Sequence, residues 1–449
     1  MRVIIYNDSH RKEADYYIKR AERLWGREDA RPAPRSGEIF GRELTPLEAV
    51  QVILADVRAG GDEAVCAWCA KIDRVPMTPE LLKCGEKEFL EARRKVAPEF
   101  LDALRLAKER IFAYHRKQLH ESWMMREPGG TELGQRYVPL ERAGLYVPGG
   151  TGGNTPLIST FLMDAIPALV AGVKEIAVCS PPAADFSASP HLLAAAGELG
   201  ISGVFKAGGA QAIGAMAFGT ATIPKVDKIV GPGNIFVTLA KRQVYGLVGL
   251  DLLAGPSEIV IVADGSANPS YAAADLLSQA EHDAEAGCLL ITHDAVLAQA
   301  VSAEVDKQAE SLPRAAIAKR ALETNGAIIV TGSPEESIRL ANEAAPEHLE
   351  LHMADPEKYL PEIKHAGAVF LGGYSTEPIG DYVAGTNHVL PTNATARFSS
   401  ALSVDDFMKK ISVIKMSPGG FREIAGAAEI LASAEGLEAH ARAVRIRRQ

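Results

Sequence analysis

The sequence predicts an α/β protein with two incomplete Rossmann-like domains, each an open parallel sheet, and with small appendage segments at the N- and C-termini. From about residue 144 onward, short apolar and often β-branched runs alternate with helical stretches. This alternation is typical of βαβ units, whose parallel strands are buried on both faces. Several of the apolar runs pass directly into glycine-rich turns. The chain has 449 residues, 47% of them hydrophobic, which is enough for two cores.

The N-terminal part of the chain is predicted to be mainly helical. Residues 1–30 are expected to form an appendage that starts with a short strand-like run. A helix is predicted to begin at Thr45, because Thr45 and Glu48 have the spacing of a capping box and Pro46 occupies the first helical position. A second long amphipathic helix is expected over roughly residues 98–118.

The expected strands of the two sheets are the runs "EIAVCS", "KIVG", "EIVIVAD", "CLLITHD", "AIIVTG" and "AVFLGG". Glycine-rich turns lie at residues 206–219, 230–234 and 253–258. Because ligands bind beyond the carboxyl ends of the strands in open parallel sheets, we expect the functional site at that edge. After a strand-like "ISVIKM", the last ~45 residues are predicted to form a small helical tail.

The composition predicts a soluble protein without a nucleic-acid or membrane partner. The 48 basic and 57 acidic residues give a net charge of −9, which opposes binding to a phosphate backbone. No apolar stretch approaches the roughly 20 residues that span a bilayer. The N-terminus lacks the apolar core and small-residue cleavage site of a secretory signal, so we expect a cytoplasmic protein.

Five cysteines, at positions 66, 69, 84, 179 and 288, form no paired framework, which suits a reducing cytoplasm. Cys66 and Cys69 make a single CxxC inside an expected helix. Ordinary helix packing is the favoured interpretation, and a metal or redox role is the minor alternative.

Two of the glycine turns are candidates for a phosphate-binding site. "GGAQAIG" (208–214) and "GPGN" (231–234) each follow a strand and open a helix, so their backbone amides can approach a phosphate. Neither is a GxGxxG, and glycines at such joints are often there for steric reasons alone. Two together in one βαβ series favour a dinucleotide site.

Two other segments carry side chains that suit a metal ion. Gln279 and His282 are three residues apart in a helical stretch and therefore share one helix face. The run "GDYVAGTNHVLPT" brings Asp381 and His388 after the strand "AVFLGG". These nitrogen and oxygen donors suit zinc, and manganese or cobalt stays possible because no cysteine is among them. Each residue also has an ordinary interpretation as a packed or solvated polar side chain.

The segment "APEHLE" (345–350) has two interpretations. Glu347 and His348 follow an amphipathic run, so they are either solvated side chains at a helix end or a general acid/base pair where a helix passes into a strand. Pro346 is predicted to end the helix and to fix the direction of the pair. In "SAEGLEAHARAV", the spacing of Glu435 and His440 by itself predicts only a solvated helix face.

Taken in order, these motifs resemble the histidinol dehydrogenase family over nearly the whole chain. The resemblance rests on "GLYVPGG", "GGAQAIGA", "VDKIVGPGN", "GPSEIVIVAD", "ADLLSQAEHD", "ANEAAPEHLELH", "GDYVAGTNHVLPT" and "EGLEAHARAV". It implies oxidation of L-histidinol to L-histidine with two NAD⁺ and one zinc per subunit, the last two steps of histidine biosynthesis. It also implies a homodimer in which the C-terminal segment of each chain reaches into the partner's active site.

The resemblance assigns roles residue by residue. The implied zinc ligands are Gln279, His282, Asp381 and His440, and these four are also implied to face the substrate. Glu347 and His348 match the acid/base pair and the substrate-contacting set, to which Ser257, His388 and Glu435 also belong. Tyr146, Gln211 and Asn234 match cofactor contacts. One departure is Ala394, where the resemblance leads us to expect a glycine.

The implied domain boundaries combine the motifs with the strand pattern. Residues 1–30 form the N-terminal appendage, 31–143 with 257–402 the first Rossmann-like domain with the catalytic and metal residues, 144–256 the second, NAD-binding domain, and 403–449 the C-terminal helical tail.

The expected mechanism needs two hydride transfers and one added water. A neutral His348, whose ordinary pKa lies near 6.5, is expected to take the hydroxyl proton, and Glu347 is expected to activate water for the aldehyde. The alternative is a related NAD-dependent dehydrogenase of another small polar alcohol on the same scaffold. A zinc hydrolase without NAD and a non-catalytic nucleotide-binding module rank below it.

Overall fold

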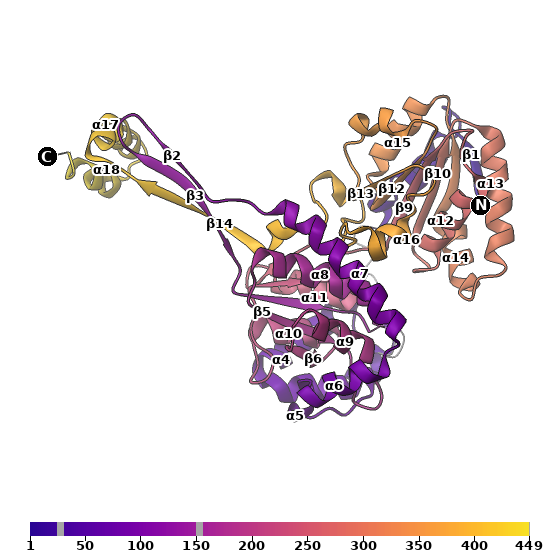
Figure 1. Cartoon of the computed structure of the whole chain (residues 1–449), viewed down its shortest axis with the longest axis horizontal. Coiled ribbons are helices and arrows are strands. Elements are labelled where there is room, and N and C mark those ends of the chain that lie inside the picture. The colour runs from indigo at the N-terminus through magenta and orange to yellow at the C-terminus, as the bar shows by residue number, and fades with distance from the viewer. Residues whose placement is uncertain (25–30, 150–155, 449) are drawn as a thin grey trace.

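The computed structural model describes residues 1–24, 31–149 and 156–448. Figure 1 shows a body of two α/β halves and a long arm that carries the C-terminus. The end of the predicted N-terminal appendage and Gly150 of "GLYVPGG" lie outside the described residues. The predicted fold class, α/β with two Rossmann-like open parallel sheets, is confirmed.

The first half is built on a six-stranded parallel sheet with the order β1-β11-β10-β9-β12-β13. Its strands are β1 (Arg2–Ile5), β9 (Glu258–Ala263), β10 (Gly287–Thr292), β11 (Gly326–Val330), β12 (His348–His352) and β13 (Ala368–Leu371). Its main helices are α12 (Pro269–Ala280), α13 (Ala295–Ala309), α14 (Ala315–Asn325) and α15 (Pro334–Ala344). The predicted apolar runs of this half are strands in the structure. Their nearly continuous burial explains why they do not alternate between apolar and polar residues.

The second half is built on a five-stranded parallel sheet with the order β6-β5-β4-β7-β8. Its strands are β4 (Arg142–Tyr146), β5 (Glu175–Ser180), β6 (Val204–Lys206), β7 (Lys228–Val230) and β8 (Gly249–Leu250). The helices that follow them are α8 (Ile158–Ala171), α9 (Pro190–Glu198), α10 (Gly209–Phe218) and α11 (Ile235–Val244). The chain order reverses between β4 and β7, which makes this point of the carboxyl edge the expected ligand crevice.

The helices before residue 143 pack on the five-stranded half. They include α4 (Pro46–Trp68), α6 (Glu86–Lys95) and α7 (Pro98–His115), which contact α10, α9 and α8 respectively. The Thr45 capping box is present, and the apolar face of α4 shares a core with Ile213 and Met216. These helices pack mainly on the five-stranded half, although α7 also contacts residues 380–384, and the grouping of 31–143 with 257–402 stays a prediction. The apolar stripe of α4 matches the buried faces of α10 and α11.

The N-terminal segment is more than an appendage. β1 pairs with β11 as the edge strand of the six-stranded sheet, from Arg2 opposite Ala327 to Ile5 opposite Val330. Two short helices follow, α1 (Arg11–Ile18) and α2 (Arg20–Leu24). The described part of the predicted appendage thus belongs to the first half.

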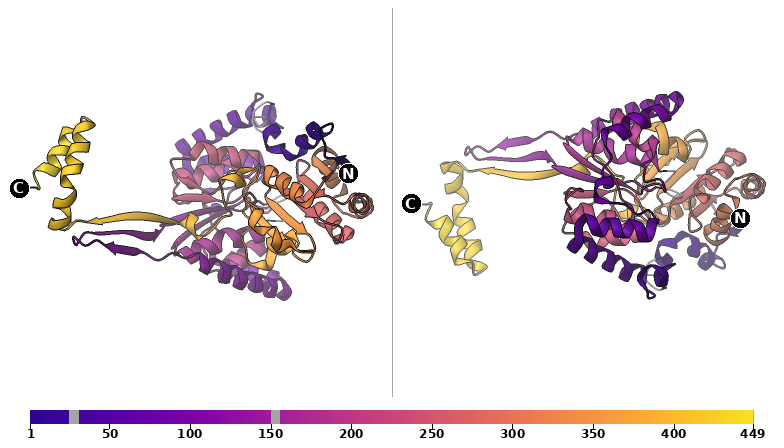
Figure 2. Two further views of the ribbon diagram at one scale, coloured as in Figure 1. Left: turned by 90° about the horizontal axis from the view of Figure 1, so that it is seen from above. Right: turned by 90° about the horizontal axis from the view of Figure 1, so that it is seen from below.

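The arm is a three-stranded antiparallel sheet of β2 (Trp123–Arg126), β3 (Glu132–Pro139) and β14 (Met408–Lys415), which ends in α17 (Pro418–Ala434) and α18 (Glu438–Arg445). Figures 1 and 2 show these two helices far from the body. The predicted helical tail after "ISVIKM" is confirmed, whereas β2 and β3 were not predicted. All five cysteines are buried and unpaired. Within the described ranges, we find no helix with the length and apolar character needed to cross a membrane.

Candidate active site

The candidate catalytic residues lie at the amino edge of the six-stranded sheet. The first residues of β9, β10, β12 and β13 line up at this edge. Glu258 of β9 is opposite Gly287 of β10, and His348 of β12 is opposite Ala368 of β13 and Ile259 of β9. The prediction of a site beyond the carboxyl ends is therefore wrong for this sheet. It fails because the pair stands at the start of β12, at the junction with the preceding helix.

The helix that precedes Glu347 and His348, α15, ends abruptly. α15 ends at Ala344, and Ala345 takes a left-handed conformation with φ of 48°. Pro346 follows, as predicted, and cannot continue a helix. The carbonyl of Pro346 accepts a hydrogen bond from the Gly367 N–H, at 2.9 Å, which fixes the entry into β12.

Glu347 and His348 are both held by the backbone of Glu258. The Glu258 N–H donates to Glu347 Oε2 at 3.1 Å, and His348 Nδ1 lies 3.2 Å from the Glu258 carbonyl oxygen. Because that oxygen can only accept, Nδ1 carries the proton and Nε2 is the free atom of the ring. The two residues are only 6% and 3% exposed, so both are shielded from bulk solvent.

The pKa values of Glu347 and His348 differ from those of isolated side chains. Burial raises the pKa of Glu347 to about 7. Burial by itself lowers the pKa of His348, but Glu347 and the further carboxylates Glu377 and Asp381 outweigh it and raise that pKa well above its ordinary value. The expectation of an unperturbed His348 is thus wrong. Its protonation state depends on whatever neutralises these carboxylates.

Three of the four predicted metal ligands lie at this edge. Gln279 is fully buried at the end of α12, and neither atom of its amide has a hydrogen-bond partner. His282 Nε2 lies 4.0 Å from Glu377 Oε1, and Asp381 Oδ1 lies 3.7 Å from His348 Nε2. The ligand atoms of His348, Glu377 and Asp381 all lie within 4.8 Å of one another. This set of nitrogen and oxygen donors suits a zinc ion.

The fourth predicted ligand is not brought to this edge by its own chain. His440 lies in α18, and Glu435 directly follows α17, so both stand at the end of the arm, where they are exposed. Figure 1 shows both helices remote from β12. Within one subunit, the structure therefore does not unite them with the other candidates.

The remaining predicted substrate contacts lie where the two halves meet. Ser257 directly precedes β9, and its carbonyl accepts from the Gly287 N–H at 3.0 Å. His388 Nδ1 lies 2.9 Å from the Asp381 carbonyl oxygen, and its Nε2 lies 3.1 Å from Thr160 Oγ1. Thr160 is in the first turn of α8, which follows β4, so His388 links the two sheet edges.

The predicted cofactor contacts lie at the carboxyl edge of the five-stranded sheet, as expected. The Tyr146 hydroxyl accepts from the Gly209 N–H at 3.0 Å, and Gln211 Nε2 donates to Asp73 Oδ2 at 3.3 Å. Asn234 caps α11 by accepting from the backbone N–H groups of residues 236 and 237. The glycine turns therefore present helix N-termini, which favour a phosphate.

A buried polar cluster behind the pair was not predicted. His348, Glu350 and His352 alternate along β12 and so share one face. His352 Nε2 lies 3.0 Å from Glu350 Oε2 and 3.5 Å from Asp275 Oδ2. Glu350 in turn accepts from the Glu377 N–H at 2.8 Å. The alternation of charged residues in an otherwise apolar strand was the available signal for this cluster.

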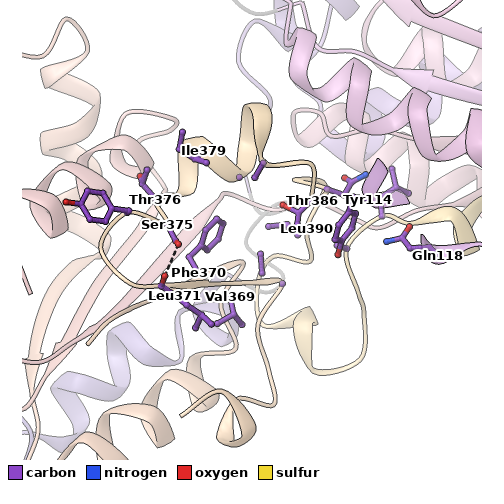
Figure 3. Close-up of a pocket in the computed structure, with 18 residues that line it drawn as sticks. Tyr114, Gln118, Val369, Phe370, Leu371, Ser375, Thr376, Ile379, Thr386 and Leu390 are labelled. Atoms are coloured by element: carbon purple, nitrogen blue, oxygen red, sulfur yellow. Dashed lines mark hydrogen bonds between the residues drawn. The ribbon is translucent and has the colours of Figure 1, made fainter. Parts of the chain in front are cut away.

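A cavity of about 590 Å³ adjoins the pair but contains none of the predicted site residues. Figure 3 shows its walls, including Tyr114, Leu390 and Phe370. The Phe370 ring also lies against His348, with ring centroids 6.1 Å apart. Phe370 therefore separates this cavity from the base.

Hydride transfer to a nicotinamide is the chemistry that a Rossmann-type edge and a neighbouring acid/base pair serve together, so the fold and the site define an NAD-dependent dehydrogenase. A model of the family described as Histidinol dehydrogenase matches residues 42–448. The chain belongs to the histidinol dehydrogenase family.

Similar proteins cover nearly the whole chain. The histidinol dehydrogenase of Moorella thermoacetica is 51% identical over 92% of this chain and 97% of its own length. That of Bacillus subtilis is 51% identical over 89% of this chain and 92% of its own length. The crystal structure of histidinol dehydrogenase from Elizabethkingia anophelis superposes with a TM-score of 0.88 at 38% identity, covering 100% of this chain and 98% of that one.

Proposed function

We propose that the protein oxidises L-histidinol to L-histidine through L-histidinal, with two NAD⁺ and one zinc per subunit, as the last two steps of histidine biosynthesis. The observation that carries this proposal is the convergence of Glu347 and His348 with Gln279, His282 and Asp381 at one sheet edge, in a chain of this family. A contact between His388 and Thr160 also joins this sheet edge to the five-stranded half, which carries the glycine-rich turns of residues 208–214 and 231–234.

The residues present fit a zinc ion. The Gln279 amide is buried without a hydrogen-bond partner, which costs free energy. The exposed His282 imidazole and the partly buried Asp381 carboxylate add a nitrogen and an oxygen donor that suit zinc. When bound, zinc supplies a Lewis acid that holds the substrate's nitrogen atoms, and NAD⁺ supplies the acceptor for a hydride in each oxidation. A divalent cation at Asp381 also opposes the rise in the His348 pKa.

His348 and Glu347 divide the proton transfers. His348 Nε2 takes the hydroxyl proton in the first oxidation, releases it to water, and takes the proton of the hydrated aldehyde in the second, while Nδ1 stays fixed on the Glu258 carbonyl. Burial raises the pKa of Glu347 to about 7, which suits a general base that removes a proton from the water that adds to the aldehyde. Cys288, on β10, is fully buried, and burial raises the pKa of its thiol, which favours this water route over a thiohemiacetal.

The cofactor is proposed to bind at Tyr146, Gln211 and Asn234. Ser257, His388, Glu435 and the zinc ligands contact the substrate. We infer a homodimer in which His440, as the fourth zinc ligand, and Glu435 come from the partner subunit. Their exposure at the end of a long arm, remote from their own site, supports this assignment. We place the enzyme in the cytoplasm, which would keep its five unpaired cysteines reduced.

The decisive experiment measures NADH formed per L-histidinol, with and without a chelator. We expect two NADH per substrate, loss on chelation and recovery with zinc. Turnover of another small polar alcohol but not of histidinol would favour the related-dehydrogenase alternative. Hydrolysis without any NADH would instead indicate a zinc hydrolase.

The shared site has its own test in mixed dimers of His348→Asn and His440→Asn chains. Each variant alone is expected to be inactive. Random mixing should restore roughly a quarter of the wild-type activity, because half of the dimers are mixed and each mixed dimer has one intact site. A histidine that acts within its own chain would give no recovery.

A further inference from the structure

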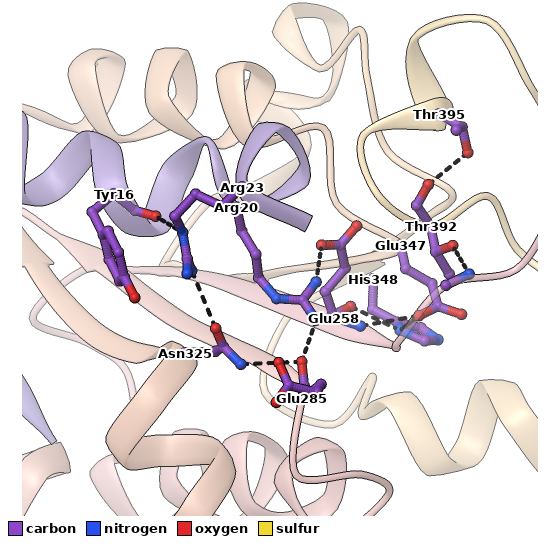
Figure 4. Close-up of polar contacts among 11 residues, drawn as sticks. Tyr16, Arg20, Arg23, Glu258, Glu285, Asn325, Glu347, His348, Thr392 and Thr395 are labelled. Atoms are coloured by element: carbon purple, nitrogen blue, oxygen red, sulfur yellow. Dashed lines mark hydrogen bonds and ion pairs between the residues drawn. The ribbon is translucent and has the colours of Figure 1, made fainter. Parts of the chain in front are cut away.

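A buried ion pair lies directly beneath the acid/base pair. Arg20 Nη1 is 3.0 Å from Glu258 Oε2, and the two residues are only 4% and 9% exposed. Arg20 belongs to α2, in the N-terminal segment, whereas Glu258 opens β9. Figure 4 shows the chain of contacts that runs from α2 through Glu258 to Glu347 and His348.

Glu258 connects its ion pair to the catalytic groups through its own backbone. Its N–H donates to Glu347 Oε2, and its carbonyl oxygen accepts from His348 Nδ1. The orientation of both catalytic side chains, and the tautomer of the imidazole, therefore depend on the position of a single peptide segment. A shift of Glu258 would move both groups at once.

The side chain of Glu258 is held in place by positive charge and dipoles. Burial raises the pKa of the Glu258 carboxyl, and Arg20 together with the backbone N–H groups of Asn393 and Ala394 opposes that rise. Asn393 and Ala394 both adopt left-handed conformations, with φ of 52° and 59°. Ala394 stands where a glycine was expected, yet it adopts the left-handed turn that points the two backbone N–H groups at Glu258.

Arg20 is itself fixed by more than the ion pair. Its second guanidinium nitrogen donates to the Glu285 carbonyl oxygen. A Cβ placed on Gly287 would lie 3.1 Å from Arg20 Cδ, so the side chain passes closely over the start of β10. An arginine held by a carboxylate, a carbonyl and a close backbone contact has little freedom to move.

We propose that Arg20 and Glu258 form one positioning unit that holds Glu347 and His348 in their catalytic orientation. The N-terminal segment is thereby part of the catalytic apparatus, although it contributes no group that touches the substrate. This inference rests on the roles proposed above for Glu347 and His348.

The test compares Arg20→Gln, Glu258→Gln and the double variant, each in the zinc-loaded enzyme. We expect each single variant to lower kcat about tenfold to a hundredfold, because displaced catalytic groups lose their alignment. The KM for histidinol and the zinc content should stay within about twofold of wild type, because neither residue contacts ligand or metal. The double variant should be no slower than the slower single variant, because the two residues act as one unit.

Two further variants separate positioning from simple stability. Arg23→Gln is the matched control, because Arg23 lies in the same helix but bonds the Tyr16 carbonyl and Asn325 instead of Glu258. It should leave kcat unchanged. Arg20→Lys keeps the charge and should retain more activity than Arg20→Gln.

The proposal is overturned if Arg20→Gln and Glu258→Gln lower the melting temperature but leave kcat within about twofold. Additive losses in the double variant would overturn the single-unit arrangement. If Arg20→Gln alone does not fold, Glu258→Gln, whose side-chain oxygen can still accept from Arg20, is measured by itself against the same criterion. A His348→Asn enzyme that still turns over would instead refute the proposed function, so the two failures are distinguishable.

Discussion

The two sheets of the molecule are built alike but use opposite edges. In the five-stranded sheet the candidate cofactor residues follow the carboxyl ends of β4, β6 and β7, and they are uncharged. In the six-stranded sheet the candidate catalytic residues stand at the amino end of β12, amid several carboxylates. The strand order alone therefore does not locate a site. The amino edge becomes usable where a sharply capped helix such as α15 delivers polar side chains directly to a strand.

The contact between His388 and Thr160 explains why opposite edges are needed. It joins the loop after β13 to the first turn of α8, so the amino edge of one sheet meets the carboxyl edge of the other. A hydride donor on one side can then face an acceptor on the other. The predictions below test this division between a charged, catalytic edge and a neutral, cofactor edge.

The largest effect is expected from His348→Asn, at the charged edge. Loss of the general base should lower turnover by about a thousandfold or more, whereas zinc content should stay at one per subunit. Metal analysis together with steady-state kinetics measures both quantities. Loss of zinc in this variant would mean that His348 serves the metal and not proton transfer.

Glu347→Gln should separate the two oxidations. An amide still accepts the Glu258 N–H but cannot deprotonate water, so aldehyde oxidation should fall about a hundredfold and alcohol oxidation less than tenfold. Rates measured separately with L-histidinol and L-histidinal give the comparison. Equal losses in both half-reactions would count against water activation.

Asn234→Ala tests the neutral edge. Loss of the α11 cap should destabilise the protein by about 1 kcal/mol, and the KM for NAD⁺ should rise several-fold while kcat changes little. The matched control is Asp294→Ala, which removes the same two-donor cap from α13. The control should show a similar stability loss with an unchanged KM for NAD⁺. Identical kinetics in both variants would argue against Asn234 as a cofactor contact.

The smallest effect is expected from Asp73→Asn, which is also at the neutral edge. Burial raises the pKa of Asp73 from 3.8 to about 6, so the folded state favours the protonated carboxyl. That preference stabilises the fold fully below pH ~4 and is lost as the pH rises through ~6. Asparagine cannot ionise, so the variant should melt higher than wild type at pH 8, with a smaller difference at pH 5. A difference independent of pH would contradict this assignment.

Most of the fold could be predicted, because the buried strands carry their own apolar runs and several helices, such as α4, α11 and α13, begin with their own side-chain caps. Which helices cover which sheet could not, since α4 lies next to neither sheet in sequence and its partner is chosen by surface complementarity. β2 is exposed and β3 is only partly buried, so neither carries the long apolar run that marks the strands of the two cores. β3 pairs with β14, roughly 270 residues later, and β2 pairs with β3.

The candidate site was predictable where polar residues occur in an unusual local sequence context, as in "APEHLE" and "GDYVAGTNHVLPT". Glu258 and Glu377 lie next to such motifs, and the sequence alone offers no reason to prefer them over any other carboxylate. Arg20 has no local signal, because its importance comes only from a partner more than 230 residues away. Side chains that act through tertiary contacts are missed for this reason.

The pairing of β1 with β11 has a consequence for biosynthesis. Arg2 cannot find Ala327 until roughly 320 residues have been added, which takes about 16–65 s at the usual rates of translation. During that interval the five-stranded half can already fold, while β1 has not yet met β11, the strand with which it pairs. β11 therefore recruits a strand that was made roughly 320 residues before it.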